Sequence, residues 1–534
     1  MSFRFFKSRS WDIRNVEHPW THNRSIYEHI LAHLRPEPGL TEGGDELPDE
    51  GRIGDGTGWH WAPGALDGAF GHHGGAGSSA AEVAQEILNA LAALTRKATN
   101  ERARDFYSLL SDHSTLEFID PLLEAIVQDE RINPERLHSI ARWIATESPD
   151  REPVKTAIAI LGLVPGGGDR DLLITLGRHD EFTLYVAVAL RNTEDEPEHW
   201  LFELAKYVTG WGRVQIIERL AGTEDERIKA WLLREGYKND ILIEYTALIC
   251  AKSGDLLGAL RLSQPDDDLL KGTGEILKAL VQGRGGPAEG LEAYPEGAEV
   301  ADLYLAHLSA SEPDLEDFLV VTSIESFLDE PEGEAHDAAL GWPQRRAVLL
   351  DHIKAIRSRP GWEEQVHEGL ASEDPQLFWH AAEAAKVLGV DTWDVYFNRL
   401  QHGEDHWYFV MQTDTLERID RVVQLAEERL PLKDIASGPG NELGLGPEFQ
   451  PHSALDFVLQ DLRRFPGTGW PLIRAGLQSP VIRNRNGALR VIASWQREEW
   501  PLEATSLLGG ALEDEPNAET RELIRKVIAG EALD

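Results

Sequence analysis

The segment Gly58–Gly75 gathers residue types that can bind a metal ion or a partner. It combines aromatic rings, imidazoles and one carboxylate with six glycines: Trp59, His60, Trp61, Asp67, Phe70, His72 and His73 carry the side chains of interest. Two histidines and one carboxylate on one face are the ligand set of non-haem iron sites. The segment is therefore a candidate binding surface, and Asp67 is its candidate catalytic carboxylate.

A structural role for the same residues competes with a metal site. His29 and His33 stand four residues apart on a predicted helix, so both imidazoles could reach one ion. However, terminal repeats of helical arrays are atypical in composition, and tryptophans among glycines suit a cap with tight turns. We favour the cap and expect no metal or other cofactor. The candidate ligands, if a metal were bound, are His60, His72, His73, His29 and His33.

Two further stretches carry residues of catalytic type. "HGEDHW" (His402–Trp407) again spaces two histidines by four, but no glutamate directly follows the first, so a solvated helix end is the simpler interpretation. In "GPEFQPH", Glu448 could be a buried carboxylate beside Phe449. Acid–base catalysis also requires a second positioned group. Glu448 is thus a candidate catalytic residue with no predicted partner.

The charge balance limits the classes of partner. The chain has 534 residues, with 52 Lys and Arg against 92 Asp and Glu, which gives a net charge of −40. Such a field repels phosphate backbones and anionic headgroups, so we expect neither nucleic acid nor membrane as partner. A basic protein or peptide segment fits this charge better. A salt-adapted host and a GC-rich genome explain the acidity equally well.

Other compositional features indicate a cytoplasmic protein. Cys250 is the single cysteine, which excludes an intramolecular disulfide, and its place in "TALICAK" predicts helix packing. The amino-terminal residues lack an apolar signal region, and no apolar stretch approaches the ~20 residues of a membrane span. Cytoplasmic localisation is the expectation.

From about residue 80 the pattern predicts one helix after another. Thr223 is expected to cap a helix that ends at Gly236. Asp374 and Pro375 start another that ends at Gly389, and Ser479 starts a third. On the second of these helices the predicted apolar stripe is Leu377, Ala381, Ala384, Ala385 and Leu388.

Apolar cores recur at Leu161, Leu190, Leu220 and Leu248, in steps of 29, 30 and 28 residues. This length suits two short helices and two turns, which must stack on neighbouring pairs to bury their apolar faces. The best strand candidate is Phe318–Ile324, which a buried helix explains as well. The predicted class is all-α, a helical-repeat solenoid (α-α superhelix) with an irregular N-terminal cap.

Three segments interrupt the helical pattern and divide the chain. Residues 35–79 are rich in glycine, proline and acid, residues 328–344 are acidic, and residues 433–452 form a long Gly/Pro loop. The predicted organisation is a cap over 1–79, repeats over 80–327, a linker over 328–344, repeats over 345–432, the loop 433–452 and repeats over 453–534.

The Asp-Pro and Ser-Pro helix starts resemble HEAT-type repeats. The phrases "GWGRVQIIERLAGTEDERIKAWLLREGYKND", "GALDGAFGHH" and "GPGNELGLGPEFQPH" resemble a family of bacterial helical-repeat proteins often labelled limonene hydroxylase. The label implies oxygenation of a monoterpene and oxidation of the alcohol. It assigns no catalytic residue to these phrases.

Oxygen insertion needs haem, flavin or non-haem iron. Cys250 lies in a predicted helix, which does not suit a haem thiolate, and neither "GPGNELG" nor "VPGGGDRD" follows a strand as a dinucleotide-binding loop must. Only non-haem iron survives as a cofactor for such an enzyme. The sequence therefore favours a non-catalytic scaffold that binds a protein or peptide on its concave face. An oxidoreductase of the limonene hydroxylase type and a metal-dependent hydrolase remain the alternatives.

Overall fold

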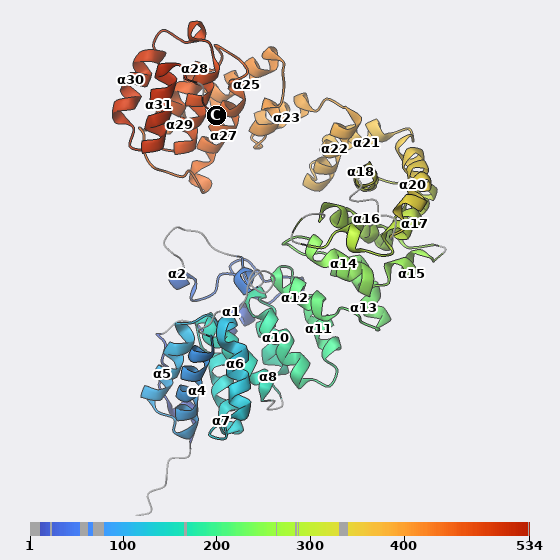
Figure 1. The fold of residues 1–534 in the computed structure, drawn as a ribbon, viewed down its shortest axis with the longest axis vertical. Helices are drawn as coiled ribbons and strands as arrows, with labels where there is room; N and C mark the ends of the chain where they lie inside the picture. The colour runs from blue at the N-terminus through green and yellow to red at the C-terminus, as the bar shows by residue number, and fades with distance from the viewer. Residues whose placement is uncertain are drawn as a thin grey trace, which may run out of the picture. The chain divides into compact units, whose positions relative to one another are not determined.

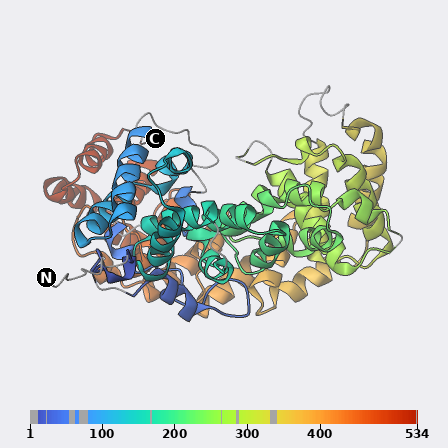
Figure 2. The ribbon, with the colours of Figure 1, turned by 90° about the horizontal axis from the view of Figure 1, so that it is seen from below.

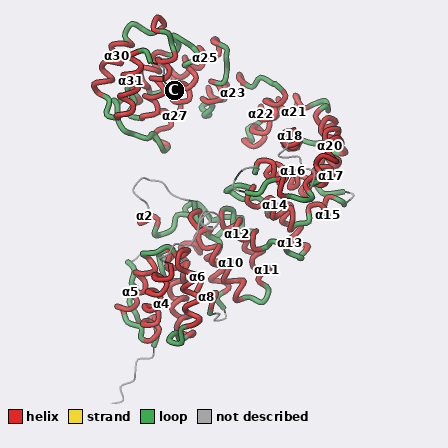
Figure 3. Tube along the Cα trace, in the orientation of Figure 1, coloured by secondary structure: helices red, strands yellow, loops and turns green. Residues whose placement is uncertain are grey.

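The computed structural model describes residues 11–21, 24–53, 62–67, 80–164, 168–262, 264–283, 286, 288–329, 340–531 and 533. Over these residues the chain is helix joined by turns and loops (Figure 3), and the β-type pairing is one isolated parallel bridge between Glu442 and Val481. The predicted all-α helical-repeat class is confirmed. Phe318–Ile324 lies inside a buried helix and not in a strand.

The chain forms two compact units, Met1–Arg359 and Pro360–Asp534 (Figure 1). Unit 1 contains η1 (Ile13–Asn15), α1 (Ile26–His33), α2 (Glu50–Ile53), α4 (Ala80–Arg96), α5 (Asn100–Ser111), α6 (Thr115–Gln128), α7 (Pro134–Glu147), α8 (Arg151–Leu163), α9 (Arg170–Gly177), α10 (Asp180–Thr193), α11 (Pro197–Ala205), α12 (Trp211–Arg219), α13 (Glu226–Trp231), the π-helical turn η2 (Leu232–Gly236), α14 (Glu244–Ser253), α15 (Leu256–Leu260), α16 (Asp267–Gln282), η3 (Leu291–Ala293), α17 (Gly297–Ala310), α18 (Leu315–Asp329) and α20 (Trp342–Arg357).

Unit 2 contains α21 (Trp362–Leu370), α22 (Pro375–Leu388), α23 (Trp393–Gln401), α24 (Trp407–Met411), α25 (Leu416–Arg429), α26 (Leu432–Ile435), η4 (Pro447–Phe449), α27 (Gln450–Leu462), α28 (Trp470–Leu477), α29 (Ile482–Ser494), η5 (Arg497–Glu499), α30 (Ala504–Asp514) and α31 (Ala518–Ala529). The predicted linker 328–344 does not coincide with the division between units. Its ends belong to α18 and α20, which pack on each other, and residues 330–339 lie outside the described residues.

The repeat period appears as a row of equivalent helices in unit 1 (Figure 2). Leu161, Leu190 and Leu248 lie in α8, α10 and α14, and Leu220 directly follows α12. All four side chains are buried, and α8, α10, α12 and α14 pack in that order. The period thus marks the second helix of each pair, whose apolar face is covered by the helices before and after it.

For the predicted helix boundaries, both ends of α22 and the end at Gly236 are confirmed, and the starts at Thr223 and Ser479 are wrong. Asp374 caps α22, Pro375 is its first residue, and Gly389 closes it with a φ of +71°. The cap of α13 is Asp225 and not Thr223, because the Thr223 hydroxyl accepts from the Asp225 N–H. Similarly, the Ser479 hydroxyl accepts from Val481 N–H and ends a turn just before α29.

The described part of the predicted cap is a strap along several repeats and not a lid on the first one. We use "strap" for residues 11–21, 24–53 and 62–67. Trp11 donates to the carbonyl of Leu94 at the end of α4. The Ile26 N–H donates to Ser148 before α8, and the Gly39 N–H donates to Tyr207 before α12. The strap therefore follows the turns between helices from α4 to α12, and α1 packs on α7 and α9.

Within the described residues, we find no helix with the length and hydropathy to cross a bilayer. Cys250 is buried in α14, where burial raises the pKa of its thiol, so the predicted packing role is confirmed.

At Gly64 the backbone of the strap lies close against the repeats. Its φ is +72°, and a Cβ there would lie 2.7 Å from the carbonyl oxygen of Asp180. Gly222 has a similar φ of +77° but nothing within 4 Å. Gly222→Ala should cost about 1–2 kcal/mol from the backbone alone, and Gly64→Ala should cost clearly more. Chemical denaturation of both variants tests this, and equal losses would show that the strap does not pack closely at Gly64.

Candidate functional site

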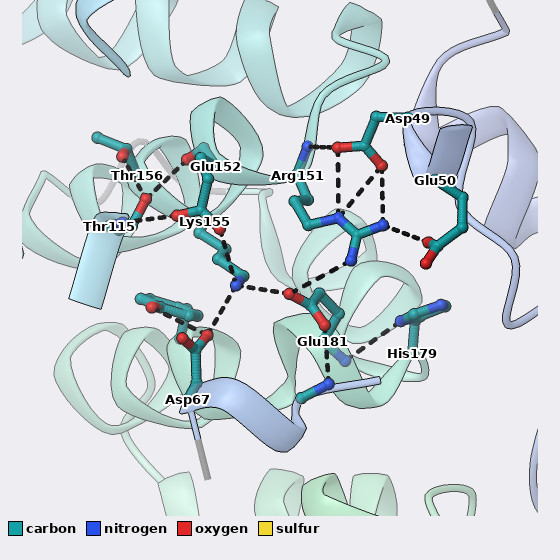
Figure 4. A network of polar contacts seen from close by, with 12 residues as sticks. Asp49, Glu50, Asp67, Thr115, Arg151, Glu152, Lys155, Thr156, His179 and Glu181 are labelled. Carbon is teal, nitrogen blue, oxygen red and sulfur yellow. Dashed lines mark hydrogen bonds and ion pairs between the residues drawn. The ribbon is translucent and has the colours of Figure 1, made fainter. Parts of the chain in front are cut away.

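One acidic side chain of the strap, Asp67, lies beside the buried amine of Lys155 near the start of α8 (Figure 4). The Lys155 Nζ lies 2.8 Å from Asp67, 2.6 Å from Glu181 and 3.1 Å from Glu152. Only 2% of the Lys155 side chain is exposed. Asp67 also accepts a hydrogen bond from the Tyr185 hydroxyl at 3.2 Å. A sequence candidate, Asp67, is thus placed in a buried ionic cluster that joins strap, α8 and α10.

A second cation, Arg151, extends this cluster along the strap (Figure 4). Its side chain pairs with Asp49 at 3.1 Å and with Glu50, and its backbone N–H donates to Asp49 at 2.8 Å. Glu181 bridges the two halves, because its carboxylate lies 2.6 Å from Lys155 and 4.0 Å from Arg151. It also accepts from the Gly64 N–H at 2.7 Å. The cluster therefore holds the strap through both side chains and backbone.

The charge states in the cluster follow from burial and pairing. Burial alone would lower the pKa of Lys155, but Glu181, Glu152 and Asp67 raise it well above its ordinary value. Burial would raise the pKa of Glu181, but Lys155 and Arg151 lower it to about 2. For Asp67, burial outweighs Lys155 and raises the pKa. Lys155 thus stays protonated, whereas a nucleophilic lysine needs a lowered pKa. The cluster is therefore suited to holding the strap against the repeats and not to covalent catalysis.

The same edge of unit 1 holds further carboxylates at helix N-termini. The Thr115 N–H that opens α6 donates to Glu152 of α8 at 2.5 Å. Asp180 of α10 accepts from the N–H groups of Gly210 and Gly212 at the start of α12, at 3.1 and 2.9 Å. Such carboxylates satisfy unpaired N–H groups and lie at the positive end of the helix dipole. Carboxylates therefore tie α6 to α8 and α10 to α12.

Most of the sequence candidates in Gly58–Gly75 cannot be placed. Trp59, His60, Trp61, Phe70, His72 and His73 lie outside the described residues.

His29 and His33 do lie on a helix, α1, and their rings are 4.4 Å apart. Each ring is hydrogen-bonded through one nitrogen to a backbone carbonyl: His29 to that of Gly44, and His33 to that of His29. Among the residues that the structure describes, no three His, Cys, Asp or Glu side chains are grouped to hold a metal ion.

One further sequence expectation is corrected and another is confirmed. Glu448 is exposed and not buried, because Pro447–Phe449 form a single 3-10 turn that leaves no side chain in the core. The interpretation of "HGEDHW" as a solvated helix end is confirmed, since His402 is exposed and directly follows α23, while His406 precedes α24. His402 bonds to the carbonyl of Asn398, while His406 bonds to Glu404.

A second candidate site is a groove in unit 2 between the pair α21–α22 and the pair α23–α24. It has a volume of about 1180 Å³. Aromatic side chains from both pairs line it: Phe378, Trp379, Tyr396, His406 and Phe409. Arg399 lies over the Phe378 ring at 3.8 Å and pairs with Glu404 at 2.9 Å. We call this the aromatic groove.

Acidic side chains outnumber basic ones in the aromatic groove. Four carboxylates line it, Glu373, Glu383, Asp394 and Glu404, against one guanidinium, Arg399. Its apolar part is partly open to solvent, since 48% of Trp379 is exposed. The surface can accept a ligand that carries positive charge and apolar groups.

The sequence alone does not predict the aromatic groove, although "HGEDHW" supplies two of its lining residues, Glu404 and His406. The predicted apolar stripe places Leu377 in the core of α22, whereas Leu377 is 44% exposed and Phe378 is buried in its place. The signal was available in "LFWH", because three consecutive bulky apolar residues cannot share one helix face. One of them had to face outward.

Comparisons with known proteins add little. No family model matches the chain, and no curated protein matches it. A solved structure described as an engineered protein has 15% identity over 83% of this chain and 98% of its own, with a TM-score of 0.21. That likeness is too low to bear on fold or function, and the limonene hydroxylase resemblance stays a prediction.

Replacing Lys155, which carries the buried amine, should lower the free energy of unfolding of unit 1. Lys155→Met leaves Asp67, Glu152 and Glu181 without their shared cation, which should destabilise unit 1 by about 3–5 kcal/mol. Lys206→Met is the matched control, since its pair with Glu203 is 37% and 38% exposed and should be worth less than about 1 kcal/mol. Similar losses in urea denaturation would show that the cluster is not a fastening point.

Asp180 should give stability a pH dependence of its own. Burial raises the pKa of Asp180 to about 7, although two backbone N–H groups oppose this. A carboxyl with a raised folded-state pKa gains stability as pH falls from that value toward its unfolded pKa. The stability of the wild type relative to Asp180→Asn should therefore increase from pH 8 to pH 5. Melting temperatures of both proteins across this range give the difference, and a constant difference would show that Asp180 does not titrate there.

Proposed function

We propose that the protein is a non-catalytic helical-repeat scaffold that binds a peptide segment of a partner protein. The observation that carries the proposal is the aromatic groove of unit 2, lined by rings and carboxylates from α21 to α24. The segment it would bind carries basic residues together with apolar anchors.

The dimensions favour a peptide over a small molecule. Pockets for small ligands usually have ~300–1,000 Å³, and the groove is larger, with about 1180 Å³. Grooves between helices commonly bind peptides through a few apolar anchors. Trp379 and Phe409 are the accessible rings in this groove that could receive such anchors.

The charge favours a basic segment. Four carboxylates and one guanidinium group line the groove, within a chain of net charge −40. Glu383, Asp394 and Glu404 are paired with Lys386, Arg421 and Arg399, whereas Glu373 forms no ion pair with a described residue. Electrostatic complementarity of this kind accelerates association and rejects acidic competitors. It also makes binding dependent on salt.

Fluorescence anisotropy with a labelled synthetic peptide of alternating lysine and leucine tests the proposal. The wild type should bind this peptide, and its twin with glutamate in place of lysine should not bind. Trp379→Ala should weaken binding by about tenfold, as loss of an aromatic anchor does. Glu373→Gln should weaken it less and reduce its salt dependence.

Matched controls keep the outcome specific. Leu502→Ala removes a fully exposed apolar side chain of unit 2 outside the groove, and Glu427→Gln removes an exposed carboxylate of α25. Neither should change the affinity. Equal binding of the lysine and glutamate peptides, or full affinity in Trp379→Ala, would refute the proposal.

A further inference from the structure

Unit 2 also holds a basic pocket, on the surface formed by α27 and α29. It has a volume of about 580 Å³ and is separate in its lining residues from the aromatic groove. Three guanidinium groups line it, Arg463, Arg483 and Arg490, against two carboxylates, Asp456 and Asp461. The chain as a whole has 92 acidic and 52 basic residues, so the charge of this pocket is opposite in sign to the net charge of the chain.

Arg463 and Arg490 are exposed, and neither forms an ion pair with any of the residues that the structure describes. The third, Arg483, donates from Nη2 to the Ser453 hydroxyl at 2.6 Å. Its Nε is buried without a hydrogen-bond partner and lies 3.8 Å from Asp456. The guanidinium groups of this pocket thus have N–H groups with which they can bind a ligand.

The two carboxylates do not neutralise the pocket. Asp461 is paired with Arg464 at 3.0 Å and accepts from Gln412 at 3.2 Å, so its charge is already compensated. Burial raises the pKa of Asp456, although Arg483 and Arg490 lower it in part. A doubly negative ligand would therefore meet a net positive lining.

Gly487 lies in the wall of the pocket, and helix packing does not require a glycine at this position. It lies inside α29, where glycine costs about 1 kcal/mol relative to alanine. A Cβ there would meet Leu459 at 3.6 Å and Asp456 at 3.7 Å, which is ordinary contact. The missing side chain instead widens the pocket beside Arg483 and Arg490.

We propose that this pocket binds a small, doubly charged oxyanion through Arg463, Arg483 and Arg490. Guanidinium groups present paired donors that match phosphate and carboxylate oxygens, and the volume suits a small molecule. At physiological ionic strength the charge of the rest of the chain is screened beyond ~8 Å, so it does not prevent anion binding here. The shared chemistry fits a phosphate monoester or a dicarboxylate.

Isothermal titration of the full chain with glycerol phosphate and with succinate, at constant ionic strength set by sodium chloride, tests the site. Binding of glycerol phosphate alone assigns a phosphate monoester, and binding of succinate alone assigns a dicarboxylate. Either result supports the pocket if Arg490→Gln and Arg463→Gln each weaken binding by about tenfold. Arg104→Gln, which removes an exposed guanidinium of α5, should leave it unchanged.

Gly487→Leu separates loss of the site from loss of the fold. The new side chain fills the pocket while it improves helix propensity, so binding should disappear without a lower melting temperature. No binding of either anion by the wild type, or binding that survives both arginine variants, overturns the proposal. Trp379→Ala should leave anion binding intact, so this result is independent of the aromatic groove.

Discussion

Three helices of unit 1 need acceptors for their first N–H groups, and carboxylates supply them: Glu152 for α6, Asp49 for α8 and Asp180 for α12. Glu181 in α10 accepts in the same way from the Gly64 N–H of the strap. Glu152, Asp49 and Glu181 have Lys155 or Arg151 as counter-ions, whereas Asp180 forms no ion pair with a described residue and burial raises its pKa to about 7. The strap and the repeats therefore stabilise each other, because carboxylates of the strap pair with Lys155 and Arg151 of the repeats.

The need to pair buried charges leaves the ionic cluster of unit 1 with a structural role and without accessible catalytic groups. Asp67 has the residue type of a catalytic acid, but its oxygens are engaged by Lys155 and Tyr185. Side chains with accessible chemistry lie instead in unit 2, where Trp379 is half exposed and Arg490 has no carboxylate partner among the described residues. Unit 1 is thus held together by buried charge, and unit 2 presents both candidate binding surfaces.

The helical architecture could be predicted because it is encoded locally. The leucine period and the Asp374–Pro375 start depend on nearby residues, and both are confirmed. Caps were harder to place, since Thr223 and Ser479 bond to backbone just outside the helices they were expected to open. Two adjacent polar residues can each begin a turn, and only tertiary packing selects between them.

The sites could be predicted much less well, because they join residues far apart in sequence. The residue type and setting of Asp67 mark it as a candidate, but no local pattern marks Lys155, 88 residues further along the chain, as its partner. The aromatic groove needs two helix pairs and the basic pocket joins α27 to α29, and no local pattern reveals which exposed rings or arginines come together. Only the surplus apolar residue in "LFWH" was a usable signal.

Native-state hydrogen exchange tests most directly whether strap and repeats form one cooperative structure. The amides of Ile26, Gly39 and Gly64 bond to acceptors in the repeats. They should open with the same free energy as core amides of α8 and α10, and Lys155→Met should lower all of them together. Fast exchange of the strap amides beside protected helices, unchanged by the substitution, would contradict this account of the fold.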